Sequence, residues 1–523
     1  MSELLGNYVG GRWVGGTDGG TPLLDPVLGT ELVRVSSAGL DLTQAFAFAR
    51  SEGGGALRAM SYAQRAAMLG RCADVLKANR DRYYDIALTN SGTTKADSGP
   101  DIDGAIFTLN WYARAGAALG EAHALLDGAA VGLNKDGSFK SRHVLVPARG
   151  VALCINAFNF PAWGLWEKTA PALLSGVPVI AKPATVTAWL AQQMVADIVA
   201  AKVLPDGALS IVCGNSAGLL DPLGPQDLLS FTGSAETAGV LRGHAALRRH
   251  SVRANMEADS LNSALLDPDA APGSEPFALL VRETLREMTV KSGQKCTAIR
   301  RIFVPEASFD AAADALRAEL AKVVTGNPRD ASVRMGSLVS RAQRDTVLDG
   351  IAQLKGEAAV LFDGADTPFV AADPAIAACV APVLLGLRDA RGAGAVHALE
   401  VFGPVATLIG YRDLASAYEM IHAGGGSLVS SLYSANPDFI ATASLELAAS
   451  HGRIHAISPA IAATQTGHGN VMPMSIHGGP GRAGGGQELG GLRALDFYHR
   501  RCALQAETAA IQAVEATAVA WAC

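Results

Sequence analysis

From about residue 145 onward, short apolar runs rich in β-branched residues alternate with longer stretches rich in alanine and leucine. The apolar runs of the first half have the length of strands: 151–155, 177–181, 209–213 and 228–231. Between them, residues 163–174 and 188–201 have the length and composition of crossover helices. This alternation is typical of a parallel sheet flanked by helices, so we expect a Rossmann-like α/β domain.

A second series of strand-like runs follows Glu257: 263–266, 301–304, 406–409 and 427–430. A helix is expected over residues 276–291, and it runs directly toward Cys296. A chain of 523 residues is too long for one ordinary core. We therefore predict two α/β domains with parallel sheets, which meet near residues 255–265.

The segment 132–146 breaks this alternation. Asp136 and Gly137 form a turn dipeptide between two extended arms, which is a strong signal for a hairpin. Because an isolated hairpin is only marginally stable, we expect it to pair with a C-terminal strand or with another subunit. The tail from Glu507 to Cys523 is rich in alanine and valine, and we expect a packed terminal or interface helix there.

The overall composition is that of a globular protein. Apolar residues make up 49% of the chain and charged residues 18%, and the formal net charge is −6. The sequence has no Lys/Arg run of the kind that binds nucleic acid, no apolar stretch of membrane-spanning length and no secretory signal. We therefore expect a cytoplasmic protein that binds neither nucleic acid nor a membrane.

The cysteines and histidines predict neither a metal site nor a disulfide framework. The seven cysteines are scattered and form no CxxC pair, which favours a reducing compartment. His451 and His455 have helical spacing but no third ligand nearby, and such pairs are usually structural or solvated. We therefore expect no metal.

Cys296 is the strongest candidate for chemistry. It lies in the run Val-Lys-Ser-Gly-Gln-Lys-Cys-Thr-Ala, whose glycine and small polar residues leave a thiol accessible. A cysteine nucleophile needs a depressed pKa or an adjacent base. Glu257, at the expected domain junction, could be a base that activates water, although an exposed glutamate is usually only solvated.

Three further motifs follow expected strands, at the sheet edge where α/β proteins bind ligands. Asn159, in Asn-Ala-Phe-Asn-Phe-Pro, could stabilise an oxyanion together with the backbone N–H of Cys296, or it could be a turn residue before proline. Lys182 could reach ribose hydroxyls or a phosphate, or be an ordinary surface lysine. Gly233 and Ser234 open an expected helix whose free N–H groups would attract a pyrophosphate.

Thr185 bears on the choice of dinucleotide. A carboxylate at this position would bind the ribose 2′-hydroxyl of NAD and repel the 2′-phosphate of NADP, whereas threonine does not repel it. We therefore expect NADP, with NAD possible. Together, the ordered motifs supply a nucleophile, an oxyanion donor, a base and a hydride acceptor, which predicts oxidation of an aldehyde through a cysteine thioester.

The same segments resemble the aldehyde dehydrogenase superfamily over nearly the full chain. The matching segments are 8–13, those around Asn159, Lys182, Gly233-Ser234 and Glu257, then 293–296 and 400–405. The resemblance implies that Cys296 is the nucleophile, Glu257 the general base and Asn159 the oxyanion donor. It also implies that Lys168 and Glu488 form a proton relay with Glu257.

The resemblance further implies the cofactor contacts and the domain organisation. Lys182 and Glu400 would hold the riboses, and Phe402 would lie beside the nicotinamide. Further contacts are expected at Ala157, Phe158, Ala184, Thr185, Gly233, Ser234 and Ala258. The expected units are a cofactor-binding domain (1–130 and 147–258), a catalytic domain (259–478), and an arm with a tail (131–146 and 479–523) that assembles a homodimer.

Several departures from the family pattern indicate a divergent branch. The usual Glu-Leu-Gly-Gly-Lys is Glu-Ala-Asp-Ser-Leu at 257–261, Ala238 stands where glycine is common, and residues 477–486 read His-Gly-Gly-Pro-Gly-Arg-Ala-Gly-Gly-Gly. These features resemble the semialdehyde dehydrogenases of aerobic benzoyl-CoA and phenylacetyl-CoA degradation. A CoA-linked semialdehyde, 3,4-dehydroadipyl-CoA semialdehyde, is therefore the expected substrate.

Two alternatives stay open from the sequence alone. A CoA-acylating aldehyde dehydrogenase or an acyl-phosphate reductase could use the same fold, but neither needs to activate water, so the carboxylate of Glu257 counts against both. A catalytically silent structural or binding protein is the alternative of another class. The presence of Cys296, Glu257 and Asn159 argues against it.

Overall fold

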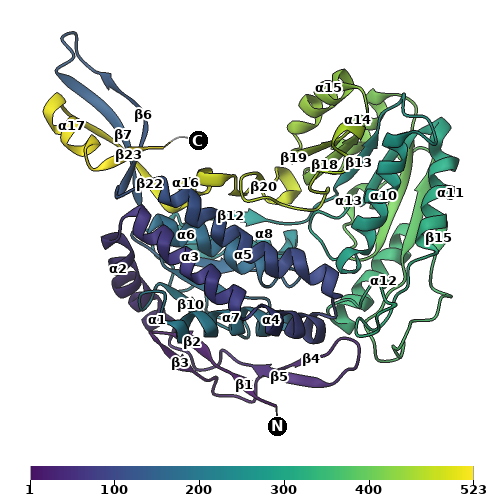
Figure 1. Cartoon of the computed structure of the whole chain (residues 1–523), viewed down its shortest axis with the longest axis horizontal. Helices are drawn as coiled ribbons and strands as arrows, with labels where there is room; N and C mark the ends of the chain where they lie inside the picture. The colour runs from purple at the N-terminus through teal and green to yellow at the C-terminus, as the bar shows by residue number, and fades with distance from the viewer. Residues whose placement is uncertain (1, 522–523) are drawn as a thin grey trace.

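Two seven-stranded sheets organise the molecule, one before and one after the junction at residues 258–262. The structure is a computed structural model that describes residues 2–521. The strand order is β12-β11-β8-β9-β10-β2-β3 in the first sheet and β15-β16-β17-β14-β13-β18-β19 in the second. Figure 1 shows the two halves side by side, with the second half at the right. The predicted α/β class with two predominantly parallel sheets is confirmed.

The first sheet combines five parallel strands with an antiparallel pair from the N-terminus. Its strands are β2 (Asn7–Val9), β3 (Arg12–Val14), β8 (Ala152–Ile155), β9 (Val179–Lys182), β10 (Leu209–Ile211), β11 (Leu228–Thr232) and β12 (Arg253–Glu257). The four strands predicted in this half coincide with β8 to β11. A small sheet of β1 (Leu4–Leu5), β4 (Thr21–Leu24) and β5 (Glu31–Val35) lies beside them.

Helices bury both faces of the first sheet. Alternate residues of β8 enter different cores: Ala152 and Cys154 pack with α3, α5 and α6, whereas Leu153 packs with α1 and α8. The helices are α1 (Leu42–Phe48), α2 (Gly54–Ala59), α3 (Tyr62–Ala78), α4 (Arg80–Ile86), α5 (Lys95–Ala117), α6 (Trp163–Ser175), α7 (Ala188–Ala201), α8 (Ala235–Arg242) and α9 (Ala245–His250). The two predicted crossover helices are α6 and α7.

The second sheet is also covered by helices. Its strands are β13 (Ser263–Leu266), β14 (Arg301–Pro305), β15 (Ala359–Asp363), β16 (Val383–Leu387), β17 (Val405–Tyr411), β18 (Ser427–Tyr433) and β19 (His451–Ile457). Every residue of β17 and β18 is buried, as expected for central strands of a parallel sheet. The helices are α10 (Glu275–Thr289), α11 (Phe309–Leu320), α12 (Arg341–Lys355), α13 (Ala395–Ala398), α14 (Leu414–His422) and α15 (Pro437–Ala448).

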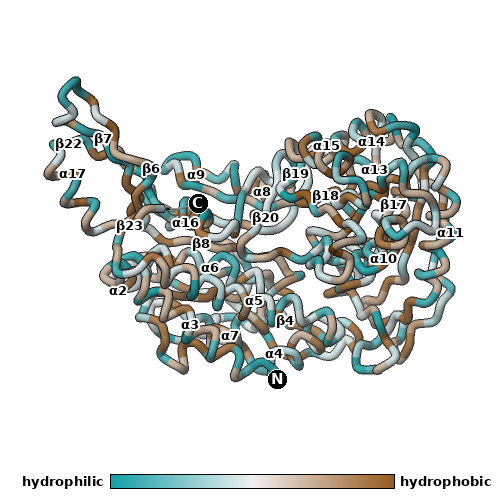
Figure 2. Tube along the Cα trace, turned by 45° about the horizontal axis from the view of Figure 1, so that its top comes forward, coloured by the Kyte–Doolittle hydropathy of each residue, from teal (hydrophilic) through white to brown (hydrophobic). Residues whose placement is uncertain are grey.

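A four-stranded arm projects from the first half (Figure 1). It contains β6 (Ala124–Gly132), β7 (Phe139–Pro147), β22 (His499–Glu507) and β23 (Ala518–Ala520). The predicted hairpin is the β6–β7 pair, and Gly137 in its turn has φ +72°. β7 pairs antiparallel with β22 along nine residues, so the C-terminal strand is the partner that the hairpin required. Figure 2 shows a hydrophilic tip on this arm and hydrophobic residues below it.

The tail differs from the single helix expected for it. Helix α17 covers only Thr508–Glu515, and the chain then forms strand β23, which pairs in parallel with β6. The reason is the unpaired edge of β6, whose backbone groups β23 satisfies, while the indole of Trp521 donates to the carbonyl of Leu492. Residues 522 and 523 lie outside the described residues.

The last segment before the arm returns to the first half. β20 (Ile476–Gly478) and β21 (Gln487–Leu489) form an antiparallel hairpin, and α16 (Leu495–Tyr498) follows it. The glycine-rich connection lies against the end of β12, because the backbone N–H of Gly486 donates to the carbonyl of Met256 at 3.0 Å. Among residues 2–521, no helix is both long and apolar enough to cross a membrane.

Candidate active site

A short loop of unusual backbone conformation presents Cys296. Helix α10 ends at Thr289, two residues earlier than predicted, because Lys291, Ser292 and Gly293 have positive φ angles of 52°, 54° and 70°. At Gly293 a Cβ atom would lie 2.2 Å from the carbonyl oxygen of Gly403, so the close approach of these two segments requires glycine. This turn places Cys296 half-buried between the two halves of the chain.

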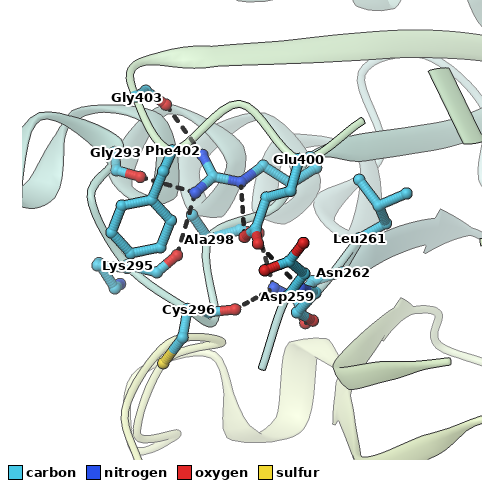
Figure 3. A network of polar contacts seen from close by, with 12 residues as sticks. Asp259, Leu261, Asn262, Gly293, Lys295, Cys296, Ala298, Glu400, Phe402 and Gly403 are labelled. Atoms are coloured by element: carbon cyan, nitrogen blue, oxygen red, sulfur yellow. Dashed lines mark hydrogen bonds and ion pairs between the residues drawn. The ribbon is translucent and has the colours of Figure 1, made fainter. Parts of the chain in front are cut away.

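Hydrogen bonds fix the backbone around Cys296 (Figure 3). Asn262 donates its amide to the carbonyls of Cys296 at 2.7 Å and Ala298 at 3.0 Å. The guanidinium of Arg300 donates to the carbonyls of Gly293 and Gly403, both at 2.9 Å. The loop that carries Cys296 is therefore tied both to the segment between the two sheets and to the segment that carries Glu400 and Phe402.

Glu257 and His477 lie beside the thiol. Glu257 is the last residue of β12 and is buried, and its carboxylate accepts from the hydroxyl of Thr232 at 3.4 Å. His477 Nε2 lies 3.1 Å from Glu257 Oε1 and 3.9 Å from Cys296 Sγ. The reactive atoms of these three side chains lie within 4.8 Å of one another. The predicted nucleophile and base are thus brought together, and a histidine joins them.

The electrostatics of this group keep the thiol protonated and the carboxylate ionised. Burial and the neighbouring Glu257 carboxylate raise the pKa of the Cys296 thiol well above its usual range. Burial also tends to raise the pKa of Glu257, but the charges of His477 and Lys168 outweigh it and hold that pKa low. A neutral thiol therefore faces an ionised carboxylate, and the thiol becomes a stronger acid only as its sulfur bonds to a substrate carbon.

Asn159 lines the same cavity as Cys296 and Glu257, in the middle of the segment that leads from β8 to α6. Its backbone carbonyl accepts from the ammonium of Lys291, which also lies 4.1 Å from the centre of the Phe160 ring. These contacts fix the backbone of Asn159 against the loop that carries Cys296.

A cavity of about 650 Å³ extends from Cys296 along the carboxyl ends of β8 and β11. Eight of the predicted cofactor contacts line it: Ala157, Phe158, Ala184, Gly233, Ser234, Ala258, Glu400 and Phe402. The rings of Phe158 and Phe402 meet edge to face with centroids 5.7 Å apart. The position of the cavity is the one where α/β sheets bind dinucleotides.

Glu400 gives this cavity a site for a hydroxyl donor. Its Oε2 accepts from the backbone N–H of Ser260 at 3.0 Å, whereas its Oε1 is buried without a hydrogen-bond partner. Burial raises the pKa of Glu400 to about 7, and Arg300 at 3.7 Å partly offsets this. A buried carboxylate oxygen that lacks a donor fits a ribose hydroxyl, so the residues present suit a dinucleotide.

Two predicted cofactor contacts do not line this cavity. The ammonium of Lys182 is buried and donates to the carbonyl of Pro183 at 2.7 Å, and the hydroxyl of Thr185 donates to that of Gly214 at 2.7 Å. Only Ala184, between them in sequence, reaches the cavity wall. The sequence predicts these residues as cofactor contacts because they follow a strand. It does not show that each side chain donates a hydrogen bond to a backbone carbonyl.

The N-terminus of α8 also differs from the expectation of free N–H groups. Ser234 caps the helix by accepting from the backbone N–H of Thr237 at 3.2 Å. The N–H of Ala235, however, donates to the carboxylate of Asp259 at 2.8 Å. Asp259 belongs to the segment that departs from the family pattern, and it takes one of the donors that would otherwise face a pyrophosphate.

A second cavity of about 530 Å³ also reaches Cys296. Aromatic residues Phe107, Phe160 and Trp163 line it, together with His477. Its wall is largely apolar, and it meets the first cavity at the thiol. This arrangement gives the thiol one approach for a dinucleotide and another for a second reactant.

Comparison with known proteins agrees with this geometry. Residues 13–500 match the sequence model of the aldehyde dehydrogenase family. The chain belongs to the aldehyde dehydrogenase family. It is 53% identical to the 3,4-dehydroadipyl-CoA semialdehyde dehydrogenase of Aromatoleum evansii over 91% of this chain and 93% of that protein. The protein is therefore an NAD(P)-dependent oxidoreductase of this family.

Solved structures of other family members share the fold. Lactaldehyde dehydrogenase from Escherichia coli aligns with a TM-score of 0.84 at 19% identity, covering 97% of this chain and 99% of that one. A betaine aldehyde dehydrogenase variant from Staphylococcus aureus, in complex with NAD⁺, aligns with a TM-score of 0.81 at 21% identity, covering 96% and 97%. At these identities the similarity concerns the fold alone.

In this aldehyde dehydrogenase, a buried network of charges lies behind Glu257. The ammonium of Lys168 donates to Glu488 at 2.8 Å and to Glu167 at 2.6 Å. Glu488 also accepts from the hydroxyl of Ser230 at 2.8 Å. Carboxylate oxygens of Glu167, Glu257 and Glu488 lie within 4.8 Å of one another. Lys168 and Glu488, expected from the resemblance, are thus adjacent to Glu257.

Glu167 and His477 are the two residues of this centre that the sequence did not single out for chemistry. Burial raises the pKa of Glu167 well above its usual range, whereas that of Glu257 is low, so the two carboxyls hold protons differently. His477 and Glu488 are register partners in the β20–β21 hairpin. Their side chains therefore leave the hairpin on one face, toward Glu257 and Lys168.

Proposed function

We propose that this aldehyde dehydrogenase oxidises a CoA-linked semialdehyde, 3,4-dehydroadipyl-CoA semialdehyde, to the carboxylic acid with NADP as the oxidant. The 53% identity with the Aromatoleum evansii protein of that name supports the substrate. The contact of Cys296 and Glu257 at the meeting point of two cavities supports hydrolytic oxidation. This grouping is the observation that carries the proposal.

Cys296 acts first as the nucleophile. The aldehyde enters through the aromatic-lined cavity, and Sγ of Cys296 attacks its carbonyl carbon. The thiol proton passes to Glu257 as the C–S bond forms. The amide of Asn159 and the backbone N–H of Cys296 donate to the developing oxyanion. When bound, the dinucleotide supplies a hydride acceptor. Loss of hydride from the hemithioacetal carbon restores the carbonyl and leaves an acyl thioester on Cys296.

Glu257 then acts as the base that releases the product. It accepts a proton from a water molecule, the water oxygen attacks the thioester carbonyl, and the C–S bond breaks. The product leaves as a carboxylic acid, and the thiol is regenerated. The network of Lys168, Glu167 and Glu488 carries the surplus proton away from Glu257, since all three are buried next to it.

We infer the preference for NADP over NAD from Thr185, which does not line the cavity itself but follows Ala184, a residue of the cavity wall. Its side chain is a neutral hydroxyl that donates to the Gly214 carbonyl, so this position offers no carboxylate to repel a 2′-phosphate. We expect a higher kcat/KM for NADP than for NAD at equal substrate concentration. A higher kcat/KM for NAD would reverse this assignment.

The assembly we propose is a homodimer formed through the arm. Four apolar side chains on the arm are exposed: Val131, Leu133, Phe139 and Val146. Exposed apolar residues grouped on a projecting sheet are typical of an interface. The arm sheet, which spans 124–147 and 499–520, would pack against the same surface of a second copy.

Product analysis separates hydrolytic oxidation from its rivals on the same fold. The purified enzyme is incubated with the CoA-linked semialdehyde and NADP, with and without free CoA and phosphate, and products are identified by mass spectrometry. Free carboxylic acid in all conditions supports the proposal. Formation of a new CoA thioester or an acyl phosphate would instead identify an acylating dehydrogenase or an acyl-phosphate reductase. A panel of free and CoA-linked semialdehydes tests the substrate class.

A further inference from the structure

Three side chains that could each bind a metal ion lie close together at the candidate active site. Cys296 offers a sulfur, His477 a ring nitrogen and Glu257 a carboxylate oxygen, and these atoms lie within 4.8 Å of one another. Glu257 and His477 are both buried, and Oε1 of Glu257 faces Nε2 of His477. Cys296 lies 39 residues after Glu257 and 181 residues before His477, so no spacing motif in the sequence reveals the group.

The two separations that involve His477 are close to those of a tetrahedral zinc site. Zinc binds nitrogen and oxygen at about 2.0–2.2 Å and sulfur at about 2.3 Å, which places ligand atoms roughly 3.3–3.7 Å apart. Here Nε2 of His477 lies 3.1 Å from Glu257 Oε1 and 3.9 Å from Cys296 Sγ. Side-chain movements of a few tenths of an ångström would bring both distances to the tetrahedral value.

Each ligand is held by its surroundings. Asn262 binds the backbone carbonyl of Cys296, and Glu257 is the last residue of a parallel strand. The ring of His477 meets the ring of Trp163 edge to face, with centroids 5.6 Å apart. Little conformational entropy is therefore lost when a metal ion binds these three side chains.

We propose that Cys296, Glu257 and His477 form an inhibitory binding site for Zn²⁺. Bonds form from the ion to Sγ, Nε2 and a carboxylate oxygen, the thiol proton and any proton on Nε2 leave to solvent, and no electron is transferred. The two cavities that meet at Cys296 leave the fourth position open to water. The ion binds both the thiolate of Cys296 and the carboxylate of Glu257, so neither group is available for the proposed reaction until the ion dissociates.

The ligand set selects among cations. A thiolate and an imidazole are soft or borderline ligands that favour Zn²⁺ and Co²⁺, whereas Mg²⁺ and Ca²⁺ require mostly oxygen ligands. One carboxylate is too few oxygens for those hard cations. Millimolar Mg²⁺ should therefore neither inhibit the enzyme nor displace Zn²⁺.

Direct binding tests the site without relying on the proposed reaction. Metal-free full-length enzyme is titrated with Co²⁺, and the thiolate-to-cobalt charge-transfer absorption is recorded. We expect a band that saturates at one Co²⁺ per chain and disappears on addition of Zn²⁺. Cys296→Ser should abolish the band, and His477→Phe should weaken Zn²⁺ binding by tenfold or more. Cys502→Ser, which removes an exposed thiol on β22, should change neither.

A measurement on the unmodified protein covers the case in which His477→Phe fails to fold. Alkylation of Cys296 by iodoacetamide is followed by peptide mass spectrometry in buffered Zn²⁺, with Cys502 as the internal reference. We expect Zn²⁺ to protect Cys296 but not Cys502, and EDTA to restore alkylation and activity together. Equal protection of both thiols, or a cobalt band that survives in Cys296→Ser, would overturn the proposal.

Discussion

At the scale of single residues, one histidine lies beside both the carboxylate of Glu257 and the thiol of Cys296. His477 lies 3.1 Å from the carboxylate of Glu257, and its charge is the largest influence that opposes burial in setting the pKa of that group. The same ring lies 3.9 Å from the Cys296 sulfur. The histidine therefore opposes the effect of burial on the pKa of Glu257.

His477→Phe tests this role. Without the imidazole, burial raises the pKa of Glu257, so the base becomes protonated at a higher pH. The acidic limb of the pH profile of kcat/KM should move upward by roughly one unit or more, and activity at pH 6 should fall more than activity at pH 9. An unchanged acidic limb would show that His477 does not control Glu257. Circular dichroism verifies that the variant is folded.

Glu400 gives a second prediction at this scale. Burial raises its pKa to about 7, and only the ionised form presents two acceptors to a ribose. The affinity for NADP should therefore increase as the pH rises through about 7. Glu400→Gln should bind the cofactor roughly tenfold more weakly and without this pH dependence. Fluorescence titration of NADPH from pH 6 to pH 9 measures both, and a variant that kept the wild-type dependence would contradict the assignment.

The sequence could predict residues whose function follows from a strand end or a local motif. Cys296, Glu257 and Asn159 were found in this way, and they line one cavity. Lys182 is also predicted as a cofactor contact, but its ammonium donates to the Pro183 carbonyl. This hydrogen bond depends on the local backbone conformation, which the residue type does not reveal. His477 could not be predicted, since it reaches Glu257 only through the pairing of the β20–β21 hairpin.

At the scale of elements, the β20–β21 hairpin positions the back of the active centre. His477 and Glu488 face each other across it, so one element orients both the partner of Glu257 and the partner of Lys168. Its glycine-rich connection allows backbone contact with β12. A Cβ atom at Gly486 would lie 2.4 Å from the carbonyl oxygen of Met256, the neighbour of Glu257.

Gly486→Ala should therefore damage both stability and activity. The added methyl group meets backbone atoms that cannot rotate away, so we expect a cost of about 1–3 kcal/mol in unfolding free energy. Displacement of His477 and Glu488 should lower kcat by roughly tenfold or more. At Gly485 a Cβ atom has no neighbour within 4 Å, so Gly485→Ala should keep kcat despite its φ of +71°. Equal kcat in the two variants would argue against a positioning role for the hairpin.

The elements themselves differ in how far the sequence determines them. The strands and crossover helices after residue 145 were predictable, because a buried strand flanked by amphipathic helices has a clear periodicity. The helix over 276–291 ended early, since the positive φ angles of Lys291 and Ser292 serve the Cys296 loop. Strand β23 was unpredictable because it exists only through pairing with β6, far away in sequence.

At the scale of the whole molecule, both halves of the chain contribute to one reaction centre. The first half supplies Asn159 and Glu257, and the second supplies Cys296. The thiol lies where the cavity lined by the predicted cofactor contacts and the aromatic-lined cavity meet. The arm stands apart from this centre, so assembly and chemistry can be tested separately (Figure 1).

The arm should control assembly. Val131 and Phe139 are 61% and 41% exposed, and burying them against a second copy would stabilise a dimer. The double variant Val131→Asp, Phe139→Asp should shift the protein from dimer to monomer in light scattering coupled to size exclusion. Lys135→Asp, an exposed change at the hairpin tip, should leave the dimer intact. A wild-type monomer, or a double variant that stays dimeric, would exclude this interface.

The central claim is that Cys296 forms an acyl thioester whose hydrolysis requires Glu257. Rapid mixing of Glu257→Gln with the CoA-linked semialdehyde and excess NADP, followed by intact-mass analysis, tests it most directly. We predict a single burst of NADPH that does not exceed one per chain, an acyl adduct located on Cys296, and negligible steady turnover. Steady turnover at the wild-type rate, or a burst that leaves no adduct on Cys296, would contradict the claim.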